Sequence, residues 1–387
     1  MIPVKYNYRN LVVRKTTTIA AAFGLALVVF VFAAAQMLGN GIKKTLGRSA
    51  APENAIVLRK GSSAEMESGI EENQVNLVLA QAAQIGASKK PPGVGELLIV
   101  ILMDKIGTNG VSNVTVRGVP ENVFEFRNTA KIIEGRAAKP GSDEVVVGSG
   151  IRGRFKGLEL GQSFEMKKNR PVKVVGIFSD DGSSFDSEVW ADLHIVRTAF
   201  GREGYVSSVR VRLDAASKFD AFKALVEQDR QLGLNVQREG DYYAKQSEMT
   251  ADFLTIMGTM IAILFSIGAM IGATITMNAQ VANRQREIGT LRALGFSRRS
   301  ILTSFLLESL VLATIGGIVG AAASLALQLV KITMINQGTW SEIAFSFEPT
   351  PAILIRSMVL AGFMGVVGGF LPAIRAARVS PIEAMRG

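Results

Sequence analysis

Hydrophobic residues gather in four stretches whose length suits a membrane-spanning helix. Residues 16–38 and 253–283 contain no charged residue, and residues 301–330 and 351–374 contain few. A helix rises ~1.5 Å per residue, so about 20 apolar residues cross a hydrocarbon core of ~30 Å. We therefore predict an integral membrane protein with four transmembrane helices. The second stretch is longer than a membrane requires, so we expect it to project as helix beyond one face.

The first apolar stretch has two interpretations. Arg9, Arg14 and Lys15 precede it and Ala33 to Ala35 offer small residues, as in a cleaved signal peptide. The apolar run is, however, longer than the ~7–15 residues of a signal-peptide core, which favours a retained anchor.

A different pattern fills residues 39–252, between the first two spans. Short β-rich runs there are bounded by Gly, Pro, Asn and Asp, and helical patterns occur at 71–85 and 216–232. About 210 residues can bury a core of their own. We predict a large α+β domain that forms either one unit or two subdomains divided near residues 105–113. The expected strands are residues 54–59, 97–103, 113–119, 144–147, 172–178 and 207–213.

Charge sets the orientation of the spans. The net charge is +10, and many arginines lie in the loop 284–300 and the tail 375–387. Positive loops remain on the cytoplasmic side, so we expect both termini to be cytoplasmic, and the α+β domain and a short loop at 331–350 to lie on the outer side. Residues 1–15 mix aromatic, apolar and basic positions, as an amphipathic elbow on the inner leaflet would.

Composition removes several kinds of chemistry. The chain has no cysteine and one histidine, His194, so a catalytic triad would depend on that residue alone. We expect no catalytic residues, no metal site, no cofactor bound by this chain and no nucleic-acid partner.

Glycines four residues apart occur in three of the apolar stretches. This spacing lets transmembrane helices approach closely, although it also arises by chance in apolar helices. The candidate helix-packing residues are Gly268, Gly272, Gly316, Gly320, Gly365 and Gly369.

Three motifs follow one another in the second half of the chain. Residues 286–295 are REIGTLRALG, residues 308–320 are ESLVLATIGGIVG, and residues 371–386 are LPAIRAARVSPIEAMR. In this order they resemble the FtsX-like, MacB-type permease family of ABC transporters. The resemblance is strong from residue 253 to 386 and extends to the rest only in layout.

The resemblance implies a half-permease of the inner membrane, with the outer domain and the loop 331–350 in the periplasm. It would pair with a second copy or a paralogue and dock on an ABC ATPase subunit. ATP-driven motion would pass along the helices to the periplasmic domain, which would act there on lipid, lipoprotein or another hydrophobic cargo. A periplasmic adaptor and an outer-membrane channel are further partners of such systems. The sequence contains no Gly-Lys dipeptide and hence no Walker A loop. We therefore expect ATP and magnesium to be bound by a separate ATPase polypeptide.

The loop after the second span is the expected contact with that ATPase. On a helix, apolar positions would form one arc, and a water-exposed loop gains from such an arc only when it packs against something. The resemblance makes this segment the coupling helix. Its candidate residues are Glu287, Ile288, Leu291, Leu294 and Gly295. Glu308, near the entrance of the third span, should face protein or the interface rather than lipid.

Two further classes of function stay open at this stage. A non-transporting transducer, similar to FtsX itself, would activate a cell-wall hydrolase. An anchored periplasmic enzyme would need a catalytic constellation, and we recognise none in the sequence. The size of the predicted periplasmic domain favours the transporter.

Overall fold

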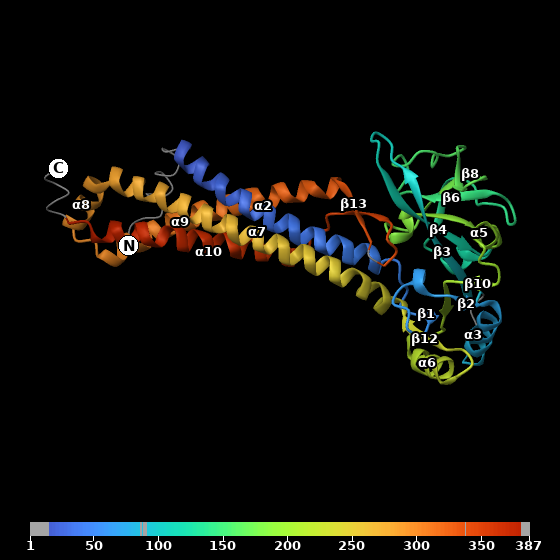
Figure 1. Ribbon diagram of the computed structural model, residues 1–387. Coiled ribbons are helices and arrows are strands. Elements are labelled where there is room, and N and C mark those ends of the chain that lie inside the picture. Colours follow the sequence, from blue (N-terminus) through green and yellow to red (C-terminus); the bar gives the residue numbers. More distant parts are fainter. Residues whose placement is uncertain (1–14, 86, 88–90, 337, 381–387) are drawn as a thin grey trace. The chain divides into compact units, whose positions relative to one another are not determined.

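The computed structural model describes residues 15–85, 87, 91–336 and 338–380, and its contacts divide the chain into two compact units (Figure 1). The helical unit comprises the described residues up to Asn40, Asp252–Val330, and those from Ser346 onward. The sheet unit comprises Gly41–Ala251 and Lys331–Phe345. The expected elbow at 1–15, apart from Lys15, and the end of the tail, 381–387, lie outside the described residues.

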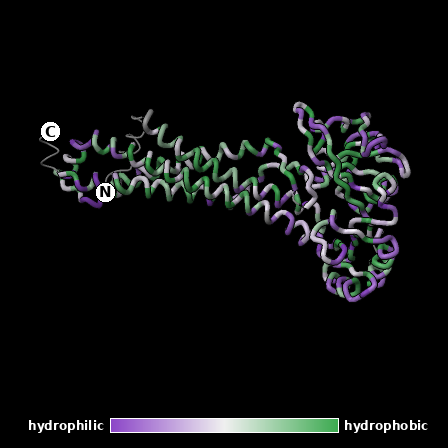
Figure 2. Tube along the Cα trace, viewed as in Figure 1, coloured by the Kyte–Doolittle hydropathy of each residue, from purple (hydrophilic) through white to green (hydrophobic). Residues whose placement is uncertain are grey.

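Four long helices, among the described residues, are long and apolar enough to cross a membrane. They are α2 (Lys15–Gly47), α7 (Glu239–Asn283), α9 (Arg298–Leu325) and α10 (Pro351–Arg378). Figure 2 shows their predominantly hydrophobic colouring. The 45 residues of α7 correspond to about 70 Å of helix at ~1.5 Å per residue, more than twice the ~30 Å hydrocarbon core.

Local sequence sets where the last two helices begin. The Ser297 side chain accepts a hydrogen bond from the Ser300 amide and caps α9. Thr350 does the same for the Ile353 amide at the start of α10, and Pro351 occupies the first helical turn, where a missing N–H costs nothing.

A ten-stranded mixed sheet forms the frame of the sheet unit. Its order is β12-β1-β11-β3-β4-β9-β6-β8-β5, with β7 paired to β8. The pairs β4/β9 and β6/β8 are parallel, and the other pairs along the path are antiparallel. The strands are β1 (Asn54–Arg59), β3 (Gly93–Asp104), β4 (Val111–Val119), β5 (Lys131–Gly135), β6 (Glu144–Gly148), β7 (Ser163–Lys167), β8 (Arg170–Ser179), β9 (Glu188–Asp192), β11 (Ser208–Arg212) and β12 (Leu234–Arg238).

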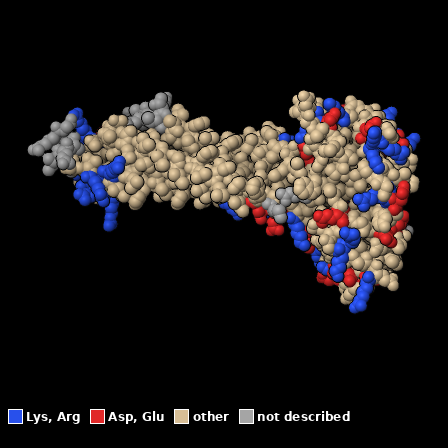
Figure 3. Space-filling model, in the orientation of Figure 1, with Lys and Arg blue, Asp and Glu red and all other residues tan. Residues whose placement is uncertain are grey.

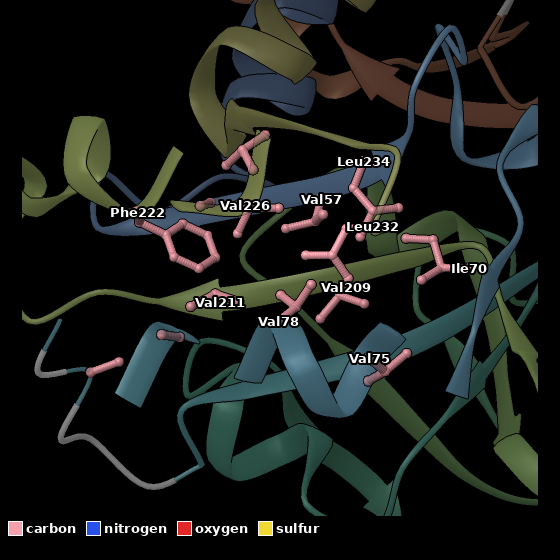
Figure 4. Packing of buried hydrophobic residues seen from close by; sticks show 14 of the residues in the cluster. Val57, Ile70, Val75, Val78, Val209, Val211, Phe222, Val226, Leu232 and Leu234 are labelled. Atoms are coloured by element: carbon pink, nitrogen blue, oxygen red, sulfur yellow. The ribbon is translucent and has the colours of Figure 1, made fainter. Parts of the chain in front are cut away.

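The first subdomain of the sheet unit packs two helices on strands β12, β1 and β11. Helices α3 (Glu72–Gln84) and α6 (Phe219–Gln228) contribute Val78 and Phe222 to its core, and both side chains are fully buried. Figure 4 shows them with Val57, Val209 and Val211 from the strands. Alternate strand residues point to one face of a sheet, so Ala55 and Val57 of β1 and Val209 and Val211 of β11 all enter this core.

The second subdomain runs in sequence from β3 to the helix α5 (Leu193–Phe200). It is inserted between strands β1 and β11 of the first subdomain. Its core comes mainly from valines of β4, β6, β8 and β9. The subdomain division expected near residues 105–113 is wrong, because Asp104 pairs with Val111 and this segment is the turn of the β3–β4 hairpin.

The prediction of an α+β domain with four apolar helices is confirmed at this level, and each of the six expected β runs overlaps a strand of the large sheet. The segment 331–350 was expected to be a short loop, but the structure adds a hairpin there. It consists of β13 (Lys331–Ile335) and β14 (Glu342–Ser346). The remaining short elements are η1 (Glu65–Glu67), β2 (Ile70–Glu71), α4 (Val123–Phe126), η2 (Ser184–Ser187), β10 (Tyr205–Val206), η3 (Ala216–Lys218) and η4 (Ala326–Leu329).

Candidate functional site

The expected coupling segment is a short helix, α8 (Gln285–Ala293), that joins α7 to α9. The helix ends at Ala293, and the chain turns away at Gly295, whose φ of +94° is a conformation that glycine adopts without strain. The Gly295 amide donates to the Arg292 carbonyl and the Phe296 amide to the Leu291 carbonyl. These bonds use carbonyl groups that the end of a helix leaves unpaired, and they turn the chain into α9.

The five candidate coupling residues do not share one exposed face. Ile288 is buried in a cluster with α7, α9 and α10, and Leu291 packs partly against the same cluster. Leu294 is 72% exposed, and Glu287 and Gly295 are exposed as well. The single apolar arc therefore divides: its first part stabilises the chain itself, and only Leu294 presents a large apolar side chain outward.

A buried ion pair fixes the start of α8. The Arg284 guanidinium donates from Nη1 to Glu308 Oε2 at 3.1 Å, and both side chains are buried. Arg284 Nε also bonds Glu287 Oε2 at 3.2 Å. Glu308 thus faces protein, as expected. Arg284 belongs to the positive loop, and it has a structural partner on α9 as well.

Four of the six candidate glycines lie at close helix contacts. A Cβ on Gly320 would lie 2.3 Å from the Ala26 carbonyl oxygen of α2, and one on Gly316 would lie 2.7 Å from that of Ala22. Gly365 and Gly369 approach Ser309 and its neighbours on α9 in the same way. Only a glycine allows the backbones to come this close.

Gly268 and Gly272 of α7 behave differently. A Cβ at either position would meet nothing within 4 Å, and both residues line an open, mainly apolar hollow between α2 and α7 of about 410 Å³. The close glycine of α7 is Gly258, where a Cβ would lie 2.0 Å from the Cβ of Ala35. It was missed because it has no partner glycine four residues away.

Most of the described arginines of the helical unit lie near α8. In Figure 3 the visible face of the helices is largely free of charge until the Lys and Arg side chains around that end. The arginines of this region are Arg284, Arg286, Arg292, Arg298, Arg299, Arg375 and Arg378.

The sheet unit contains a second site that sequence reasoning missed, a buried cluster of charges. In β4 and β11 valines alternate with polar residues, so the valines enter the two cores while Arg117 and Arg210 point to the opposite face. Such alternation ordinarily indicates a solvent-facing strand surface. Here η1 and the first turns of α7 cover that face, and Arg117 and Arg210 are 1% and 0% exposed.

We call this set the charge cluster, and its members pair closely. Arg117 bonds Glu188 through Nε and Nη2, both at 2.7 Å, and it bonds Glu65 and Glu96 through Nη1 at 2.9 Å. Arg210 bonds Glu96, Glu65 and Glu239 at 2.6–3.1 Å. The seven charged members are Glu65, Glu96, Arg117, Arg127, Glu188, Arg210 and Glu239, all buried.

The cluster strongly perturbs its carboxyl groups. Burial alone would raise the pKa of Glu65, but the Arg117 and Arg210 guanidinium groups outweigh it and lower that pKa to about 2. Burial opposes the charged form of Glu96 too, yet Arg127, Arg210 and Arg117 hold its pKa well below the usual range. Glu65 and Glu96 are therefore ionised and paired with arginines at neutral pH.

No group of three or more His, Cys, Asp or Glu side chains in the described part of the chain could hold a metal ion. His194 lies exposed in the first turn of α5, where its amide donates to the capping Asp192.

Two protein-family models match the chain, one toward each end. Residues 16–229 match the MacB-like periplasmic core domain, and residues 259–381 match the FtsX-like permease C-terminal domain. The first match covers more than half of the 387 residues.

Curated relatives agree with these families. The chain is 26% identical to the macrolide export ATP-binding/permease protein MacB of Neisseria gonorrhoeae over 288 residues, which cover 69% of this chain and 42% of the relative. It is 28% identical to MacB of Burkholderia pseudomallei over 299 residues, covering 70% and 43%. The chain thus spans less than half the length of these relatives.

Two solved structures are also similar to part of the chain. They are the periplasmic region of MacB from Actinobacillus actinomycetemcomitans (TM-score 0.37, 12% identity, 49% of this chain and 90% of that one) and the extracellular domain of the transporter YknZ (TM-score 0.35, 16% identity, 48% and 99%).

Two adjacent family matches, in the order periplasmic core and then permease, accompany four apolar helices and a large mixed sheet domain. The chain belongs to the MacB/FtsX-type family of ABC transporter permeases.

Proposed function

We propose that the chain is the membrane subunit of a transporter that hydrolyses ATP in a separate polypeptide. The observation that supports this most directly is the pair of family matches, which together extend over residues 16–381 with a short gap. The match to a MacB-like periplasmic core favours the transporter over a cell-wall transducer.

In this proposal the four apolar helices cross the inner membrane and the sheet unit is periplasmic. The arginines near α8 and at the end of α10 would lie in the cytoplasm, as the positive-inside rule requires. Both termini would then be cytoplasmic as well. The subunit would act as a dimer with a second copy or a paralogue.

The ATPase would dock at α8 and the turn after it. Leu294 supports this, because a large apolar side chain that is 72% exposed beside arginines is suited to a protein contact. Motion of the ATPase would enter α7 and α9, which α8 connects, and α7 continues into the sheet unit.

The cargo would be a lipid, a lipoprotein or another hydrophobic molecule handled on the periplasmic side. A periplasmic adaptor and an outer-membrane channel would complete the route. ATP and magnesium would be bound by the partner ATPase.

The test of docking is Leu294→Asp. Loss of ~1.5–3 kcal/mol of apolar burial and the addition of an unpaired charge should weaken docking by at least about tenfold. Leu291 is a poorer choice, because it packs partly inside the chain and its replacement would also disturb folding. Association with the ATPase and coupled hydrolysis would be measured in matched membranes.

The control is Ala293→Asp, which adds the same charge one residue earlier and keeps the leucine. Ala293 is exposed, so folding should tolerate the change. An equal loss of docking in both variants would reject the apolar contact at Leu294, and normal docking in both would reject α8 as the ATPase site.

A further inference from the structure

Glu239, the first residue of α7, divides its carboxylate between two sets of donors. Oε1 accepts from Arg210 Nη1 at 2.6 Å and lies 3.8 Å from Arg127 Nη1. Oε2 accepts from the Ala51 amide at 3.1 Å and from Asn54 Nδ2 at 2.9 Å. One side chain therefore joins the start of α7 both to the sheet and to the chain segment that follows α2.

Charge balance explains why that segment is needed. The charge cluster holds four glutamates and three arginines, so it has one more carboxylate than guanidinium groups. A buried carboxylate oxygen without donors is strongly unfavourable. The neutral donors of Ala51 and Asn54 satisfy the Glu239 oxygen opposite Arg210, so the position of segment 51–54 forms part of the cluster.

The same segment is held at its other end by serine hydroxyls. Ser49 Oγ lies 2.7 Å from Ser184 Oγ and accepts from the Ser184 amide at 2.9 Å. Both serines are buried. The residues directly after α2 are thus fixed at two points within the sheet unit.

We propose that Glu239 is a positioning residue that clamps the sheet-unit ends of α2 and α7 to each other and to the charge cluster. Both helices run without a break from one unit into the other. Under the proposed function, a fixed relation between them lets movement of the helices become movement of the periplasmic sheet. The role of the clamp in transport rests on the proposed function, whereas the contacts that form the clamp do not.

The clamp is tested in the full chain in lipid nanodiscs, without any ATPase. Spin labels on Gly47→Cys and Ala244→Cys, two exposed positions at the ends of α2 and α7, report the distance between the helix ends in a chain with no native cysteine. We expect a narrow distribution in the parent and a broader one in Glu239→Gln. The Ala51 amide should also exchange its hydrogen faster in that variant, by about tenfold.

The matched control is Glu188→Gln, which removes a charge from the same cluster but bonds Arg117 and Trp190 rather than the helix ends. It should leave the distance distribution narrow. Asn54→Ala, which leaves every arginine contact of Glu239 in place, should broaden it and carries the test if Glu239→Gln does not fold. Equal broadening in all three variants, or in none, overturns the clamp.

A second measurement connects the clamp to transport. In complexes with the ATPase, we expect the parent to keep a narrow 47–244 distribution when ATP is added, whereas Glu239→Gln should retain ATPase binding but show a broader one. If the parent binds no ATPase, the proposed function fails while the distance result for the clamp still stands. If the variant keeps the parent's narrow distribution with ATP, Glu239 does not act in transmission.

Discussion

At the scale of single residues, the charge cluster determines how the sheet unit responds to acid. The pKa of Glu65 is about 2 in the folded chain, against an ordinary value of 4.5. A carboxyl group with a lowered folded pKa stabilises the fold above its unfolded pKa, and that stability is lost as the pH falls through the folded value. The window of loss therefore lies between about pH 4.5 and pH 2.

We predict that the free energy of unfolding of the sheet unit falls by on the order of a few kcal/mol across this window. Both tryptophans of the chain, Trp190 and Trp340, lie in the sheet unit, so their fluorescence follows its unfolding. Glu65→Gln should flatten the pH dependence, whereas the exposed Glu203→Gln should retain it. An unchanged slope in Glu65→Gln would show that Glu65 is not the titrating group.

At the scale of elements, the contact of α9 with α2 depends on a missing side chain. We predict that Gly320→Ala lowers the stability of the chain by ~1–3 kcal/mol, because the added Cβ would lie 2.3 Å from the Ala26 oxygen. Thermal unfolding in detergent, followed by circular dichroism, measures this change.

Gly268→Ala is the matched control in another apolar helix. Its Cβ meets nothing within 4 Å, and alanine is favoured over glycine in a helix by up to ~1 kcal/mol. The variant should therefore unfold at the same temperature as the parent or slightly higher. A larger loss for Gly268→Ala than for Gly320→Ala would contradict the observed packing.

At the scale of the whole molecule, hydropathy and period-two alternation were enough to predict four apolar helices, the α+β domain and the general position of its strands. Long runs without charge have few alternatives to a membrane helix. The family resemblance rested on three ordered motifs, and the family matches confirm it.

The charge cluster could not be predicted in the same way. Arginine beside valine in a strand gives the same sequence pattern whether the arginine faces water or is covered by another element. Here the covering elements are η1 and α7, which are distant in sequence. The burial of Ile288 was not predicted for a related reason. A helical pattern defines an apolar face, but it does not tell whether other helices of the same chain bury that face.

Orientation in the membrane is also a property of the whole molecule, and introduced cysteines test it. We predict that Gln231→Cys and Ala293→Cys, both at exposed positions, label from opposite sides of the membrane. Ala293 is preferable to Ser297, because the Ser297 side chain caps α9. Reaction of both with an impermeant thiol reagent in intact spheroplasts would contradict the proposed topology.

The order of strands in the large sheet has a consequence for synthesis. Among the described strands, β1 pairs with β11 and β12 alone, and Asn54 lies opposite Arg212, which the ribosome adds 158 residues later. Apart from the pairing of β3 with β11, the strands of the second subdomain, from β3 to α5, find their partners within that stretch, so it can fold first. A nascent chain must therefore keep β1, with its apolar residues and unpaired backbone groups, from pairing elsewhere until nearly the whole domain has emerged. Slow steps in the maturation of this domain should arise from closing that one long loop.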